Sequence, residues 1–247
     1  MFKHGRPPPF IHPSQLGDGI RLPLLRCSRV LGLLKESDAR DSQATHNEIS
    51  NEIIASLAEY KNYDEGDLLA ALQAYNLYSI VLLFSPDKWG RTHRVEQALI
   101  FGLQDICLEV ATSGVLLNAE VNLEIPDWNE WVMVASKRRT VLAAHTVLWI
   151  WSLLHGYPPF ACRELGFMPS PAPKILWNAP NDRWQDLYQE WMRRWPGGPH
   201  RLEELQALGT EVEIDPRTQI WLEEADEFGV LLMSEGICME SIAKEHS

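Results

Sequence analysis

A long helical pattern with three consecutive cations in its interior constrains this chain more than any other feature. The pattern begins after Asp127, a residue type that caps helix N-termini, and continues to His155, where Gly156 and Pro158 end it. It is rich in tryptophan and aliphatic residues, so we expect a buried helix at the centre of the fold. The three cations within it are Lys137, Arg138 and Arg139.

Helical geometry separates these cations around the axis. Arg138 shares a stripe with Trp131 and Val141, which is expected to face the interior. Lys137 lies about 100° away around the helix and is expected to reach water. A guanidinium on the inner side needs a carboxylate or several carbonyl oxygens, since an unpaired buried charge destabilises a fold strongly. We therefore interpret the three cations as architecture rather than as a nucleic-acid patch or a nuclear address.

The acidic run EEADE, residues 223–227, offers partners for a buried guanidinium. Glu224 and Asp226 are the two candidates, and the sequence does not choose between them. Glu223 and Glu227 share a helical face, which could serve acid–base chemistry or a metal. Carboxylates early in a helix are favoured by its dipole, so a solvated face is the simpler interpretation. The candidate structural ion-pair residues are therefore Arg138, Arg139, Glu224 and Asp226.

The remaining segments predict an all-α fold. Residues 1–22 form an extended arm rich in Pro and Gly, because prolines remove backbone donors and block helix interiors. Residues 157–180 form a proline-rich irregular crossing. No strand alternation or repeat is visible, so we expect one compact array of about eight helices. The predicted helices cover residues 23–36, 48–60, 67–84, 95–113, 127–155, 181–195, 201–208 and 215–234, with a polar loop at 37–47.

The composition is that of a globular chain that contacts other proteins. A net charge of −12 over 247 residues argues against this chain holding a phosphate backbone by itself. Neither a signal peptide nor an apolar stretch of the ~20 residues that a bilayer span needs is recognised, so no membrane is expected. The cysteines lie far apart without a C-x-x-C pair, which excludes a zinc cluster and favours free thiols. They are Cys27, Cys107, Cys162 and Cys238.

No catalytic arrangement stands out. The eight histidines include no H-E-x-x-H, and the chain has no P-loop, no G-x-S-x-G and no dinucleotide fingerprint. Ser136 and His145 lie nine positions apart on one predicted helix and cannot meet. We therefore expect a protein that is not an enzyme and that holds no metal or cofactor.

Four strings carry a family resemblance. The first is PPPFIHPSQL (residues 7–16) followed by LPLLRC, and the second is WNEWVMVASKRRT (residues 128–140) with its W-x-x-W pair and its cations. The third is GYPPF with the proline-rich run to Leu176-Trp177, and the fourth is IDPRTQIWLEEADEFGVLLMS (residues 214–234). In this order they resemble the regulatory (middle homology) domain of fungal binuclear zinc-cluster transcription factors.

The resemblance implies a helical regulatory domain over residues 23–247 of a nuclear regulator, tied to secondary metabolism or nutrient response. It implies other proteins, including full-length regulators, as partners, and it allows an apolar small-molecule effector. Two departures stand out. The six-cysteine cluster that would hold zinc and contact DNA is absent from this sequence, as is the coiled-coil segment. Ala135 stands where the family often has Glu, which removes one partner for Arg138 or Arg139.

Three interpretations of the function remain open. The leading one is a regulator that acts through protein contacts, as a cofactor or a competitor of full-length regulators, without reading DNA alone. The second is a helical scaffold that binds or transforms an apolar metabolite in its tryptophan-rich interior. The third is a truncated gene model whose upstream exon encodes the zinc cluster.

Overall fold

The computed structural model describes residues 7–17, 19–36, 42–84, 93–158, 165–206 and 214–234. Helices provide the regular structure of these residues, which contain no strand, and the all-α prediction is confirmed. The α-helices are α1 (Leu22–Glu36), α2 (Ser42–Glu59), α3 (Glu65–Phe84), α4 (His93–Thr112), α5 (Asn118–Val121), α6 (Trp128–His155), α7 (Lys174–Trp177), α8 (Asn181–Arg194), α9 (Leu202–Gln206) and α10 (Pro216–Glu224). Residues 227–234 are also helical, and 3-10 turns lie at Pro13–Leu16 and Tyr60–Asn62.

α3 lies at the centre of the N-terminal half because it is apolar on nearly all sides. Its start is capped by Asp64, whose Oδ1 accepts the N–H of Asp67 at 2.8 Å. α1, α2, α4 and α6 all pack against it. Polar side chains on α3 tie it to neighbours: the amide of Gln73 donates to the Phe10 carbonyl, and that of Asn76 donates to the Thr140 carbonyl. α3 therefore positions both the N-terminal arm and α6.

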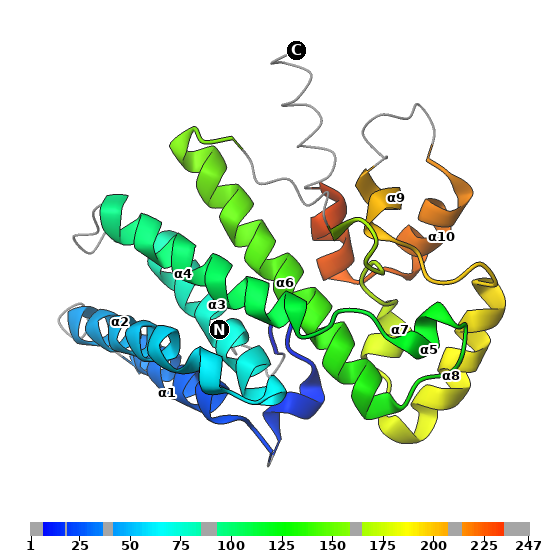
Figure 1. The fold of residues 1–247 in the computed structure, drawn as a ribbon, viewed down its shortest axis with the longest axis horizontal. Coiled ribbons are helices and arrows are strands. Elements are labelled where there is room, and N and C mark those ends of the chain that lie inside the picture. The colour runs from blue at the N-terminus through cyan, green and yellow to red at the C-terminus, as the bar shows by residue number, and fades with distance from the viewer. Residues whose placement is uncertain are drawn as a thin grey trace.

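α6 joins two halves of the structure (Figure 1). Helices α1–α4 lie on one side of it, and α5 and α7–α10 lie on the other. Its first turns pack Trp131 against Trp184 and Tyr188 of α8, with 5.0 Å between the two indole centroids. Its later turns join the main core with α3 and α4. The predicted caps are confirmed, since Asp127 accepts two N–H groups of the first turn and Gly156 ends the helix.

The N-terminal arm is part of the core. Phe10 is 4% exposed and Ile11 is fully buried. His12 then caps a 3-10 turn in the middle of the predicted extended arm, with its Nδ1 accepting the N–H of Ser14. The arm thus folds over α3 and α6 because its two apolar side chains stabilise the structure only when they are buried.

Several boundaries differ from those predicted. α2 begins at Ser42 rather than near residue 48, so part of the predicted polar loop is helical. The four-residue helices α5 and α7 are absent from the sequence prediction because a single turn leaves no periodic pattern. The continuous helix expected over 215–234 is wrong: Ala225 adopts an extended conformation (ψ 151°) and ends α10. A second helix begins after Asp226, whose Oδ1 accepts the Gly229 N–H.

Two glycines provide a matched stability test. Gly156 has a left-handed conformation (φ 68°), which a side chain adopts at a cost of about 1 kcal/mol. Gly32 lies inside α1, and no atom stands within 4 Å of an added Cβ. We expect Gly156→Ala to lower the free energy of unfolding by about 1 kcal/mol and Gly32→Ala to raise it by about 0.5–1 kcal/mol. Urea denaturation measures both, and changes of the same sign would contradict the two backbone assignments.

Candidate functional site

The three consecutive cations of α6, here called the cation triplet (Lys137, Arg138 and Arg139), are all buried. Neighbouring residues on a helix point about 100° apart, so each cation meets a different part of the chain. Lys137 meets the end of α4 and the start of α3, Arg138 meets α5, and Arg139 meets the arm and the C-terminal residues. The triplet therefore joins segments that are distant in sequence.

Lys137 is 1% exposed, so the prediction that it reaches water is wrong. Its Nζ donates to the carbonyls of Ser113 and Gly114 at 3.1 and 3.3 Å and forms an ion pair with Glu65. The reason is tertiary, because the chain leaving α4 folds over this side of α6. The two carbonyls follow the last turn of α4, where a cation is favoured by the helix dipole.

Arg138 lies on the inner side of α6, as the stripe predicts, and its partner is Glu120. The two guanidinium Nη atoms face the two carboxylate oxygens, and Nε donates to the Val115 carbonyl at 2.7 Å. Both side chains of the pair are 6% exposed. A paired fork of this kind is the geometry in which guanidinium and carboxylate bind most strongly. Glu120 comes from α5, a helix that the sequence does not predict.

Arg139, like Lys137, is 1% exposed. Its Nη1 donates to Asp226 Oδ2 at 2.6 Å and to the Pro9 carbonyl, and its Nη2 donates to the Ala172 carbonyl. The guanidinium carbon lies 4.1 Å from the centre of the Trp177 ring, a cation–π contact. Burial lowers the pKa of Arg139, and the carboxylate of Asp226 opposes that shift.

Of the four ion-pair candidates, the structure brings Arg139 and Asp226 together and keeps the other two apart. Arg138 meets Glu120. Glu224 instead pairs with Arg194 of α8 at 2.9 Å and accepts the indole N–H of Trp195. Asp226 reaches the arginine because the helix breaks before it, which turns its carboxylate inward. The sequence prediction missed Glu120, since neither its short helix nor its contact with α6 has a local signature.

A buried hydroxyl–imidazole relay links the crossing to α10. Ser170 Oγ lies 2.8 Å from His200 Nδ1, and His200 Nε2 lies 2.9 Å from Thr218 Oγ1. His200 is 2% exposed and stacks on the indole of Trp221. The adjoining cavity has a volume of only about 20 Å³, space for about one water molecule. A serine beside a histidine resembles a nucleophile with its base, but this site admits no substrate.

His200 and His12 should make the fold sensitive to acid. Burial lowers the pKa of each imidazole from 6.5 to about 4. The folded state thus keeps both rings neutral, whereas the unfolded chain takes up protons below pH 6.5. The free energy of unfolding is therefore unaffected by these rings above pH 6.5 and falls between pH 6.5 and 4. We expect a loss on the order of 2–3 kcal/mol per ring. Urea denaturation from pH 7 to 4 measures it.

The variant His200→Gln separates this effect from other acid titrations. Asp215 and Glu204 also have lowered pKa values, because each accepts hydrogen bonds, so the fold loses stability in acid through them as well. The variant should therefore be less stable than the parent at pH 7. Between pH 6.5 and 4, however, its free energy of unfolding should fall by less than that of the parent. An unchanged pH slope would show that His200 does not stay neutral in the fold.

An apolar groove is the first of two hollows that could bind a partner. It has a volume of about 510 Å³ and lies between the arm, α3, α6 and the helical residues 227–234. Its walls are hydrocarbon and aromatic except for Thr146, whose hydroxyl donates to the Leu142 carbonyl. Ile150 and Leu231 are among the residues that line it. Volume and lining are those of sites that bind apolar ligands.

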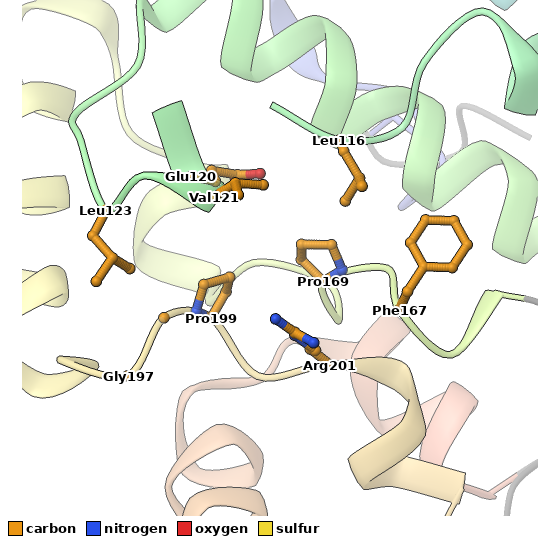
Figure 2. A pocket seen from close by; sticks show the side chains of 10 residues that line it. Leu116, Glu120, Val121, Leu123, Phe167, Pro169, Gly197, Pro199 and Arg201 are labelled. Carbon is orange, nitrogen blue, oxygen red and sulfur yellow. The ribbon is translucent and has the colours of Figure 1, made fainter. Parts of the chain in front are cut away.

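The second hollow, here called the Arg201 cleft, lies at the junction of α5, the crossing and the residues before α9 (Figure 2). It has a volume of about 250 Å³ and is lined by Leu116, Val121, Phe167, Pro169 and Arg201 among others. Phe167, a residue of the crossing, is 47% exposed and forms a wall of the cleft. The two charged side chains in its lining are Glu120 and Arg201.

The described residues contain no group of three or more His, Cys, Asp or Glu side chains placed to hold a metal ion. Cys27 and Cys107 are free thiols, and Cys162 and Cys238 lie outside the described residues. α3 is long and apolar enough to cross a membrane by length and composition, and 72% of its apolar window is buried inside the structure. Core helices of globular proteins share these properties.

Comparisons with protein-family models, with curated proteins and with solved structures find no match to this chain.

Proposed function

We propose that this chain is a regulatory module of fungal transcription that acts in the nucleus through contacts with other proteins and does not read DNA by itself. Secondary metabolism or nutrient response is the setting that the family resemblance suggests. The observation that carries the proposal is the burial of the cation triplet, the most distinctive part of that resemblance. Its charges are directed at carboxylates and carbonyls of the same chain, so it serves the scaffold rather than a phosphate backbone.

The surface supports binding to proteins. Phe101 and Leu108 of α4 are 61% and 65% exposed and lie seven residues apart, on one face of the helix. We place the proposed partner contact on this face, because exposed apolar surface is what a protein partner would cover. The net charge of −12 disfavours nucleic acid as that partner.

A reporter experiment tests this function. The chain is fused to an unrelated DNA-binding module in fungal cells, and transcription from a reporter carrying that module's site is measured. We expect output to change several-fold relative to the module alone. The double variant Phe101→Glu/Leu108→Glu should abolish the change, while Ile175→Glu, at a position of α7 that is 57% exposed, should not. Unchanged output at equal protein levels, or tight binding of the unfused chain to duplex DNA at physiological salt, would refute the proposal.

A second candidate function, binding of an apolar small molecule, is favoured by the apolar groove. Leu231 lines this groove and is 46% exposed, while its neighbour Val230 is equally exposed and does not line it. Titration with the neutral dye N-phenyl-1-naphthylamine should give saturable fluorescence. Leu231→Glu should weaken binding at least tenfold and Val230→Glu should leave it unchanged; equal effects of the two variants would rule out the groove.

A further inference from the structure

We propose that the Arg201 cleft binds a small aromatic carboxylic acid, with Arg201 as the anchor of the carboxylate. Binding at this cleft is independent of the function proposed above, because it uses neither the apolar groove nor the exposed face of α4. Three features of the cleft carry the inference: its charge, its walls and the backbone at its rim.

The charge of the cleft comes from Arg201. Figure 2 shows its guanidinium between Pro169 and Pro199, directed into the cleft. Arg201 forms an exposed ion pair of 3.6 Å with Glu203, and such contacts hold an arginine weakly. Glu120, the other charged residue of the lining, is already neutralised by the paired fork with Arg138. The cleft therefore presents one available cation, which a carboxylate complements.

The walls suit a compact ring. Leu116, Val121 and Phe167 are each between 44% and 66% exposed and give the cleft apolar walls, and Pro169 and Pro199 add flat faces. The volume of about 250 Å³ is near the lower end of small-molecule sites. This volume favours a ring with a short acid side chain over a larger ligand. Apolar walls also strengthen a charged hydrogen bond at their edge by excluding water.

The rim contains a strained residue. Leu123 has a left-handed backbone (φ 59°), and among the described residues it is the one non-glycine with a positive φ. It occupies the position that glycine usually takes after a helix, since Glu124 N–H donates to the Ala119 carbonyl and Leu123 N–H to the Glu120 carbonyl. Its side chain lies over Gly198, whose added Cβ would stand 3.4 Å from Leu123 Cδ2. Strain of this kind is concentrated at ligand-binding sites.

Leu123 also connects the cleft to a recess of about 130 Å³ beside α8, which Trp191 and Trp195 line. Leu123 and Pro199 line both hollows, so a ligand in the cleft should change the fluorescence of these two indoles. The recess gives the experiment an optical signal in the unmodified protein, without a label.

The experiment compares 3-phenylpropionate with 3-phenylpropan-1-ol, a matched neutral alcohol, by isothermal titration and by tryptophan fluorescence excited at wavelengths the probes do not absorb. We expect saturable binding of the acid with a Kd on the order of 0.1–1 mM, as suits so small a ligand. The alcohol should bind at least about tenfold weaker, because it lacks the charged hydrogen bonds.

Two variants assign the anchor. Arg201→Gln should weaken binding of the acid at least about tenfold and leave binding of the alcohol unchanged. Arg193→Gln makes the same charge change at an exposed position of α8 outside the cleft, and it should affect the binding of neither probe. Leu116→Asp adds a negative charge to the wall and should abolish binding of the acid, while Leu154→Asp at an exposed position of α6 should not. Absence of saturable binding up to 10 mM, equal binding of acid and alcohol, or equal effects of Arg201→Gln and Arg193→Gln would overturn the inference.

Discussion

Asp226→Asn should lower the free energy of unfolding by about 3 kcal/mol or more, one of the two largest effects expected of a single substitution in this chain. The reason is the position of its partner. Arg139 is 1% exposed, and its Nη1 lies 2.6 Å from the Asp226 carboxylate, so removing the negative charge leaves a buried cation uncompensated. Asparagine is chosen because it still caps the helix that follows and accepts the Gly229 N–H, which isolates the loss of charge.

The adjacent Glu227 provides the control. Its side chain is 79% exposed and lies 3.5 Å from Lys174, so Glu227→Gln should change stability by less than about 0.5 kcal/mol. The double variant Arg139→Met/Asp226→Asn should lose less stability than the sum of the losses of the two single variants, since it leaves no unpaired buried charge. Chemical denaturation followed by helical circular dichroism measures the parent and all four variants. Additive losses, or equal losses for Asp226→Asn and Glu227→Gln, would show that the pair is not coupled.

Glu120→Gln should have an effect of similar size, about 3 kcal/mol, at the other end of the cation triplet. The substitution preserves shape and one acceptor oxygen but removes the charge that faces the two Nη atoms of Arg138. Both side chains of the pair are buried, so water cannot replace the lost charge.

The exposed Glu124, four residues further along, is the matched control, and Glu124→Gln should be nearly neutral. Hydrogen exchange distinguishes this variant from the one at Asp226. Glu120→Gln should speed exchange in α5, which Arg138 holds, more than in the residues after Asp226, and Asp226→Asn should do the reverse. Uniform acceleration in both variants would mean that the two ion pairs stabilise only the global fold.

Most helices of this protein can be predicted from short stretches of sequence. The α6 boundaries follow from Asp127, Gly156 and the apolar period between them, and α10 begins where Asp215 and Pro216 predict. These features are local, because a cap acts on the N–H groups two or three residues away. The break at Ala225 is harder to predict, since the apolar period continues through it to Leu232, although Asp226 caps the helix that follows. In the folded chain, this break comes with the ion pair between Asp226 and Arg139, a contact that the local pattern does not contain.

The candidate sites were less accessible to prediction. That a buried guanidinium of α6 needs a carboxylate follows from its apolar stripe, and Asp226 was one of the two carboxylates named. The Arg201 cleft could not be anticipated, because its walls come from α5, the crossing and the residues before α9. No periodicity or spacing relates these segments to one another.

Local interactions thus decide where this chain is helical and which faces of its helices are apolar, because helix periodicity and capping act within one or two turns. Tertiary packing decides which carboxylate each cation meets, and it buries Lys137 as well as the two arginines. The pairs of the triplet with Glu120, Glu65 and Asp226 span 18, 72 and 87 residues of sequence. Contacts over such separations form only when whole helices pack, and the burial of charge then makes each pairing specific.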